Sequence, residues 1–140
     1  MKLALPLREI TQKDRPRIGG KGFALAAMQK SGMRVPEAIC ISTEAYHEYV
    51  TSTGLRDQVH IELYRKPFDE MRWEEIWDTA LRIRNLFAKT PMPSELQRDL
   101  KQAIPIRFFK HPVSVRSSAP GEDSSKTSFA GLHESFVNIR

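Results

Sequence analysis

Two short stretches near opposite ends of the chain carry residues suited to handling phosphate. The first contains Gly19, Gly20, Lys21 and Gly22, directly before a run rich in helix-forming residues. Free backbone N–H groups and the dipole at a helix N-terminus favour an anion, and Lys21 adds a mobile positive charge. The stretch lacks the full spacing of a nucleotide-binding P-loop, so a plain helix start with a solvated lysine is the alternative.

The second stretch is a short alternating run followed by paired serines. Val113 and Val115 occupy one face of the expected strand, so Arg116 projects from the opposite face, and Ser117 and Ser118 follow it. The planar guanidinium of Arg116 suits bidentate contact with phosphate oxygens, a geometry that a lysine does not reproduce. A solvent-facing strand arginine is the alternative, and it is the commoner situation for an isolated run of this kind.

Small residues follow in the closing part of the chain. Ala130 and Gly131 would let the backbone approach a ligand closely, as a loop over phosphates requires. A hairpin turn that needs a glycine would explain them equally well. Taken as a whole, residues 112–140 predict a β-loop-β unit with an arginine near the end of its first strand.

The rest of the chain must position these two stretches. The segment VPEAICIST predicts a turn and a strand, and Thr43 is expected to cap a helix that ends near Ser52. Gly32 is expected to close the helix that follows the glycines. Another helix is expected after Leu55. An extended segment is expected in LALPL at the start of the chain.

The strongest helical period lies in the middle of the chain. It joins six apolar positions: Trp73, Ile76, Trp77, Ala80, Ile83 and Phe87. Large aromatic residues at this spacing usually belong to a core, so we assign both tryptophans to packing. Pro91 and Pro93 end this helix and begin a second one. The pattern predicts an α+β fold of one domain over residues 1–140, with the helices in the middle packed on a small mixed sheet.

Composition narrows the function classes. The net charge of +5 suits a polyanionic partner, but the basic residues are scattered, which disfavours nucleic acid. Cys40 is the one cysteine, so no disulfide forms within the chain and a reducing compartment fits best. No segment has the length of a membrane span or the pattern of a signal peptide, so we expect a cytoplasmic protein. The four histidines show no metal-ligand spacing, and we assign no metal ligands.

In their order along the chain, the motifs GGKG, VPEAICIST, VRSSAPGED and SFAGLHESFVN resemble a known family. They resemble the N-terminal nucleotide-binding region of the phosphoenolpyruvate synthase and pyruvate phosphate dikinase family. The rifamycin phosphotransferases carry a similar region. The likeness covers residues 18–140, with a poorly matching helical middle. Each motif alone is weak, whereas their joint order is specific.

The resemblance implies a partial ATP-grasp-like subdomain that binds ATP together with Mg²⁺. Lys21 matches the family's phosphate-contacting lysine and Arg116 its γ-phosphate arginine, and these two are the expected catalytic residues. The expected nucleotide contacts are Gly19, Gly20, Lys21, Gly22, Arg116, Ser117, Ser118, Ala130 and Gly131. The metal ligands and the phosphorylated histidine of the family match no part of this sequence, so the expected partners are downstream domains of the same protein.

Three functions are compatible with this resemblance. The leading hypothesis is the ATP-binding N-terminal subdomain of a phosphoenolpyruvate synthase-like phosphotransferase, present here as a fragment that is inactive alone. The second is the corresponding region of a rifamycin phosphotransferase. The third is a stand-alone nucleotide-binding or regulatory module without catalysis. The sequence does not identify the acceptor substrate.

Overall fold

A computed structural model describes residues 2–120 and 135–139, and the chain divides into two compact units. Unit 1 comprises Met1–Ala45 and Asp99–Arg140, and unit 2 comprises Tyr46–Arg98. The expectation of one domain over residues 1–140 stays a prediction.

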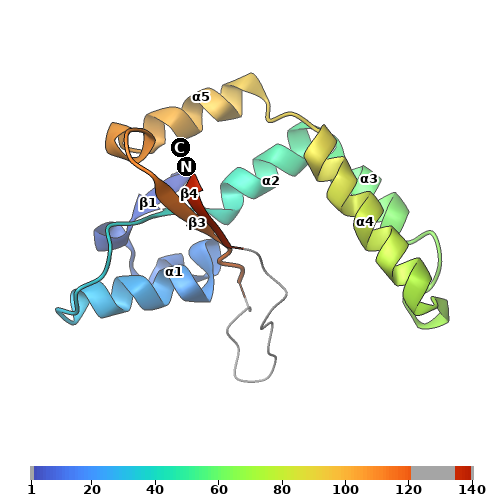
Figure 1. The fold of residues 1–140 in the computed structure, drawn as a ribbon, viewed down its shortest axis with the longest axis horizontal. Coiled ribbons are helices and arrows are strands. Elements are labelled where there is room, and N and C mark those ends of the chain that lie inside the picture. The colour runs from blue at the N-terminus through green and yellow to red at the C-terminus, as the bar shows by residue number, and fades with distance from the viewer. Residues whose placement is uncertain (1, 121–134, 140) are drawn as a thin grey trace. The chain divides into compact units, whose positions relative to one another are not determined.

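Unit 1 begins with a pair of short antiparallel strands (Figure 1). Strand β1 (Ala4–Pro6) pairs with β2 (Ile39–Ile41), with Leu5 opposite Cys40. Both strands were expected from the sequence, although each is only three residues long. Two 3-10 turns, η1 (Leu7–Glu9) and η2 (Gln12–Asp14), connect β1 to the first helix.

Helix α1 (Arg15–Lys30) begins earlier than expected from the sequence. Pro16 lies in the first turn of α1, and a capping box of Thr11 and Asp14 closes the turn η2 directly before it. At the other end Gly32 adopts φ 83°, and the Gly32 and Met33 N–H groups donate to carbonyls of the last turn. The expected glycine closure is therefore confirmed, in the form of a Schellman motif.

The core of unit 1 lies between α1 and the segment that leads into it. Five buried apolar residues form one cluster there: Leu5, Leu7, Ile10, Ile18 and Ala26. Phe23, Val35 and Cys40 pack against this cluster and are partly buried. Burying a leucine or isoleucine side chain is worth roughly 1.5–3 kcal/mol, so this cluster fixes α1 against β1 and β2.

The second pair of strands in unit 1 is β3 (Val113–Arg116) with β4 (Ser135–Ile139), again antiparallel. Val113 lies opposite Ile139 and Arg116 opposite Ser135, with an irregularity in the register between Val113 and Val115. This confirms the two strands of the expected β-loop-β unit. The strands of the described residues form two separate antiparallel pairs rather than one mixed sheet.

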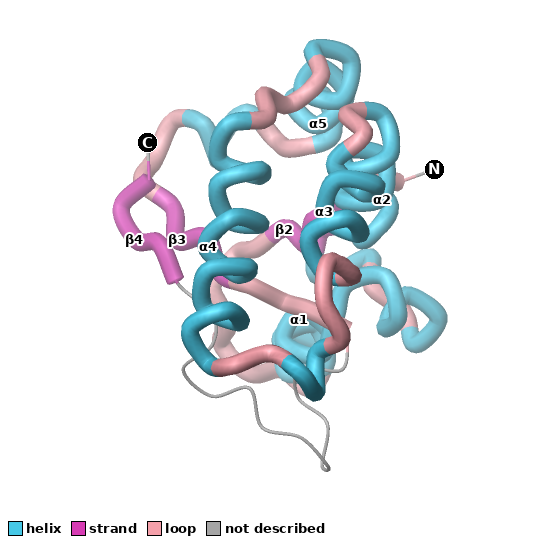
Figure 2. The backbone as a smooth tube through the Cα atoms, turned by 90° about the vertical axis from the view of Figure 1, so that its right-hand side faces the viewer, coloured by secondary structure: helices cyan, strands magenta, loops and turns pink. Residues whose placement is uncertain are grey.

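Unit 2 consists of helices. It contains most of α2 (Thr43–Ser52), all of α3 (Leu55–Leu63) and α4 (Trp73–Lys89), and the first half of α5 (Ser94–Ala103). Figures 1 and 2 both show α3 and α4 side by side. The Tyr49 hydroxyl donates to the Thr90 carbonyl at 2.8 Å, which ties α2 to the end of α4. The helices expected in the middle of the chain are confirmed, but α2 begins at Thr43 itself, so Thr43 does not precede the helix as its cap.

The tryptophans of α4 are not core residues of this chain. Trp73 is 73% exposed and Trp77 is 65% exposed, whereas Ile76, Ile83 and Phe87 are half-buried. The expected apolar face was too wide, because α4 packs chiefly against α3 and one neighbouring helix covers only one stripe of its surface. The assignment of both tryptophans to packing was therefore wrong within the described residues.

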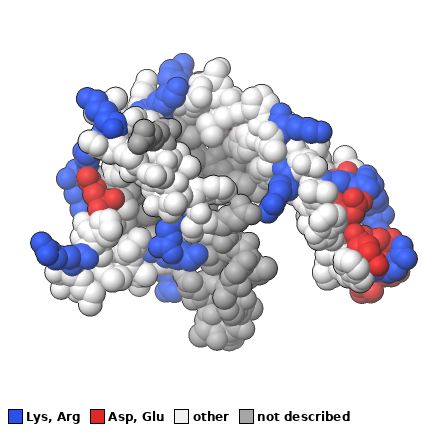
Figure 3. Space-filling view, in the orientation of Figure 1, with Lys and Arg blue, Asp and Glu red and all other residues white. Residues whose placement is uncertain are grey.

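Charged side chains are distributed differently on the two units. On the face drawn in Figure 3, acidic and basic side chains are interspersed over unit 2, and the basic side chains of unit 1 form separate groups. Ion pairs in unit 2 include Lys66 with Glu75 at 3.0 Å and Arg65 with Glu62 at 3.0 Å. Within residues 2–120 and 135–139, no helix is both long enough and apolar enough to cross a membrane.

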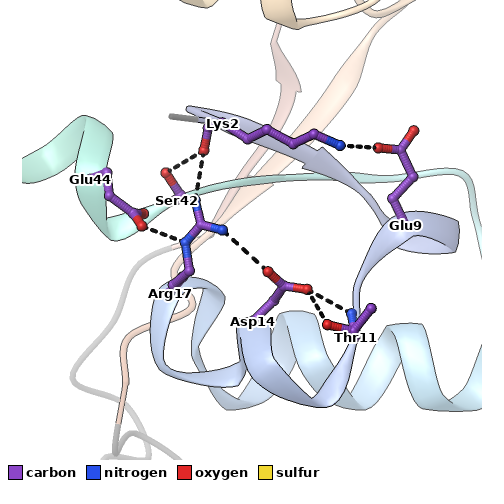
Figure 4. Close-up of polar contacts among 7 residues, drawn as sticks. All are labelled: Lys2, Glu9, Thr11, Asp14, Arg17, Ser42 and Glu44. Carbon is purple, nitrogen blue, oxygen red and sulfur yellow. Dashed lines mark hydrogen bonds and ion pairs between the residues drawn. The ribbon is translucent and has the colours of Figure 1, made fainter.

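A polar network anchors the start of α1 (Figure 4). The Arg17 guanidinium donates to Glu44, to Asp14 at 3.2 Å and to the Lys2 carbonyl at 3.1 Å. The same Lys2 carbonyl accepts a hydrogen bond from the buried Ser42 hydroxyl. Arg17 thus joins the first residues of the chain, the first turns of α1 and the start of α2. No sequence pattern indicated this network, because its members are far apart along the chain.

Asp14 lies at the centre of this network. The Thr11 hydroxyl donates to its carboxylate at 2.7 Å and the Thr11 N–H at 2.8 Å. These hydrogen bonds, with a contribution from Arg17, hold the pKa of the Asp14 carboxyl below its ordinary value. The charged form of Asp14 is therefore favoured by folding.

Acid should weaken this network. A carboxyl whose pKa is lowered by folding contributes stability that is present above its unfolded pKa, about 4, and lost as the pH falls through its folded pKa. We expect Asp14→Asn to lower the free energy of unfolding by about 1 kcal/mol at neutral pH, because a neutral amide weakens the hydrogen bonds from Thr11 and loses the ion pair with Arg17. The variant should also lose less stability than the parent on acidification. Urea unfolding followed by circular dichroism across this pH range would measure both.

Glu9→Gln is the matched control for Asp14→Asn. Glu9 also carries a lowered pKa, chiefly from its hydrogen bond with Lys2, but the pair is exposed. Exposed ion pairs contribute little to stability. Equal effects of the two substitutions on acid stability would contradict the role assigned to Asp14.

Candidate functional site

Gly19 interrupts helix α1 and creates a second helix start inside it. Its backbone lies at φ 73° and ψ 174°, a combination that essentially only glycine adopts. Gly20, Lys21 and Gly22 form the first turn after this break. The expected position of the glycines at a helix N-terminus is thus confirmed, although the break lies within a longer helix.

A hydroxyl from the other end of the chain fills the break. The Gly22 N–H donates to the Ser118 Oγ at 3.0 Å, and the Ser118 hydroxyl donates to the Ile18 carbonyl at 2.6 Å. Gly22 and Ile18 are four residues apart, so a regular helix would pair these two groups directly. Ser118 is inserted into the helix ladder at this point. The two stretches singled out from the sequence therefore meet.

The contact is close enough to require both glycines. A Cβ atom at Gly19 would lie 2.2 Å from the Ser118 carbonyl oxygen and 2.8 Å from the Ala119 carbonyl carbon. A Cβ atom at Gly22 would lie 2.7 Å from the Cys40 Sγ. Real Cβ atoms do not approach other atoms this closely, so the turn, the end of β3 and strand β2 form one packed junction.

The two expected catalytic residues lie on the two segments that meet at this junction. Lys21 immediately precedes Gly22 and is half-buried. Arg116 is the last residue of β3, two positions before Ser118, and is exposed. Ser117 lies between Arg116 and Ser118 in the chain and is half-buried. The described residues thus place one cation on each of the two segments that Ser118 joins.

Cys40 lies beneath the glycine turn. Burial raises the pKa of its thiol, so the neutral thiol is favoured. Its sulfur fills the space that a side chain at Gly22 would need. The alternation of β2 places Cys40 on the face opposite Ile39 and Ile41, and does not by itself indicate that this face packs on the core, as the structure shows it does.

Ala130 and Gly131, the residues expected to cover the phosphates, lie outside the described residues. Within residues 2–120 and 135–139, no three histidine, cysteine or acidic side chains gather in a way that could hold a metal ion. The site that the structure describes is therefore the junction of the glycine turn with the segment after β3.

Comparison with known proteins gives the same family as the motifs. Residues 15–140 match the family model described as the pyruvate phosphate dikinase AMP/ATP-binding domain. The chain is 33% identical over 144 residues to a phosphoenolpyruvate synthase from Aeropyrum pernix. The aligned region covers 99% of this chain and 17% of that protein. It is 32% identical over 140 residues to a probable phosphoenolpyruvate synthase from Staphylothermus marinus, with coverage of 95% and 16%.

A second group of relatives carries a different name. The chain is 28% identical over 139 residues to a rifampicin phosphotransferase from a Streptomyces species. The aligned region covers 99% of this chain and 16% of that protein. The chain thus spans about one sixth of the length of the curated relatives it matches. These matches confirm the resemblance that the four motifs indicated.

Substitution of Gly19 should be the most damaging single change at the junction. We expect Gly19→Ala to combine about 1–2 kcal/mol of backbone strain with about 1–3 kcal/mol of overpacking. Gly32→Ala is the matched control, because Gly32 also has a positive φ but no described atom lies within 4 Å of where its Cβ would be. Thermal unfolding followed by circular dichroism would compare the stabilities of the two variants. Equal losses of stability would contradict the packing described for Gly19.

Proposed function

Because this chain belongs to the pyruvate phosphate dikinase AMP/ATP-binding domain family, we propose that it is the ATP-binding part of a phosphoenolpyruvate synthase-like phosphotransferase. One observation supports a specific ATP site within this chain. The Ser118 hydroxyl joins the glycine turn to the end of β3, although the two segments are about a hundred residues apart. Two segments suited to phosphate become neighbours in space.

The proposed roles follow from charge and geometry. The N–H groups of the turn after Gly19 and the helix dipole favour the triphosphate, and Lys21 adds a positive charge beside them. Arg116 would bind the terminal phosphate through its planar fork of donors. Phosphoryl transfer depends mainly on positioning and on stabilising the charge of the transferred group, which these residues can supply.

Other parts of the proposal rest on the family resemblance. We expect an ATP-grasp-like site in a cytoplasmic enzyme, with Ala130 and Gly131 in the loop over the phosphates. Mg²⁺ would arrive with the triphosphate, since it usually binds phosphate oxygens, several waters and only one or two carboxylates. When bound, it would neutralise charge on the transferred phosphate. The acceptor histidine and the remaining ligands would come from further domains of the same protein.

Rifampicin phosphotransfer is the second candidate. The observation that favours it is the match of a rifampicin phosphotransferase to 99% of this chain. The two functions would share the same ATP site and differ in the acceptor. Incubating the full-length protein with ATP and either pyruvate or rifampicin, and identifying the phosphorylated product, would separate them. Binding of ATP without transfer to either would instead favour a non-catalytic nucleotide-binding module.

Replacing Arg116 should slow phosphoryl transfer far more than it affects folding. We expect Arg116→Ala to lower kcat in the full-length protein by roughly a hundredfold or more, as for loss of a donor to transition-state charge. Arg116→Lys should recover little, because an ammonium cannot make bidentate contact. Arg34→Ala, at an exposed arginine of the same unit, is the control and should leave kcat unchanged.

Unfolding curves decide how a slow Arg116→Ala variant is interpreted. Because Arg116 is exposed, the thermal unfolding midpoint of the Arg116→Ala variant should stay close to that of the parent protein. An unchanged rate of phosphoryl transfer would remove Arg116 from the mechanism. A rate lowered equally by Arg34→Ala would show a general charge effect instead.

A further inference from the structure

We propose that Ser118 is a positioning residue of the ATP site, which holds the glycine turn in its bound shape without contacting the nucleotide. The inference rests on the proposed function and assigns Ser118 a role different from the nucleotide contact expected from its motif. It follows from how the one proton of the hydroxyl is used.

A phosphate oxygen can only accept a hydrogen bond, so a serine that binds it must donate. The Ser118 hydroxyl has a single proton, and that proton points to the Ile18 carbonyl at 2.6 Å. Its oxygen meanwhile accepts the Gly22 N–H at 3.0 Å. Contact with a phosphate would require Ser118 to give up its hydrogen bond to the carbonyl of the buried Ile18, and a buried carbonyl without a partner is destabilising.

The same two hydrogen bonds stabilise the break in α1. With Gly19 outside helical geometry, the Ile18 carbonyl and the Gly22 N–H need another partner, and the hydroxyl serves both. Without it these groups would turn to water or to each other, and the first turn after Gly19 would change direction. The amides proposed to face the triphosphate would then be displaced.

Ser118 also sets the relation between the two cations. Lys21 adjoins the residue that donates to Ser118, and Arg116 precedes Ser118 by two positions in the chain. One hydroxyl therefore fixes the register of the segment carrying Lys21 against the segment carrying Arg116. Displacements of about 1 Å at a phosphoryl-transfer site can cost two orders of magnitude in rate.

The test compares Ser118→Ala with Ser118→Thr in the full-length protein. Hydrogen exchange of peptides covering residues 18–24 is measured without nucleotide, and KM for ATP is measured by phosphoryl transfer. We expect Ser118→Ala to speed exchange at least fivefold and to raise KM for ATP about tenfold. Ser118→Thr retains the hydroxyl and should restore both quantities to within about twofold of the parent.

Ser42→Ala is the matched control. It removes another serine hydroxyl of unit 1 that donates to a backbone carbonyl, and Ser42 is more deeply buried than Ser118. It should lower the thermal midpoint while leaving exchange of residues 18–24 and KM for ATP unchanged. If Ser118→Ala does not accumulate as folded protein, Ser118→Cys carries the test, because a thiol keeps only weak hydrogen bonds.

Each result has a defined consequence. Faster exchange without nucleotide, together with a raised KM that threonine restores, supports the positioning role. A raised KM with unchanged exchange would overturn it in favour of direct contact, and faster exchange with unchanged KM would reduce Ser118 to a structural residue. If the parent protein does not bind ATP, the proposed function fails, and the exchange data still decide whether Ser118 holds the turn.

Discussion

A helix cannot pass through a residue at φ 73° and ψ 174° and keep its hydrogen-bond ladder intact. Gly19 imposes this break on α1, and the rest of unit 1 is arranged around it. The Ser118 hydroxyl satisfies the separated donor and acceptor, and Cys40 fills the space beside Gly22. The anchoring of α1 by Arg17 holds the helix before the break in place. These contacts add to the packing of Ala26 and Phe23, which lie after the break, against the core of unit 1.

The break converts the middle of a helix into a place where backbone donors can face a ligand. An uninterrupted helix uses its N–H groups internally and offers none to an anion except at its first turn. By interrupting α1, the chain obtains such a turn beside the end of β3 rather than at the far end of the helix. The membership of this chain in an AMP/ATP-binding domain family is consistent with a site built in this way.

Local signals in the sequence were sufficient for much of this arrangement. The glycines, the alternation in β3 and the helical period of α4 each reflect backbone geometry, and the structure contains the elements they indicate. The meeting of Gly22 with Ser118 required the family resemblance, because no local rule links residues this far apart. Pro16 is a local signal for the observed start of α1, and the Thr11 and Asp14 pair is a local signal for the turn η2 before it. The exposure of Trp73 could not follow from periodicity, which gives the apolar side of a helix but not how much of that side a neighbour covers.

The position of the tryptophans has a consequence for spectroscopy. Both tryptophans of the chain, Trp73 and Trp77, belong to α4 of unit 2 and are exposed. Their emission should be red-shifted even in the folded chain and should respond to collisional quenchers. Intrinsic fluorescence of this chain therefore reports the helical unit, while unit 1, with its glycine turn, contains no indole. A fluorescence change on adding nucleotide would accordingly be a signal from α4, and not a direct view of the phosphate site.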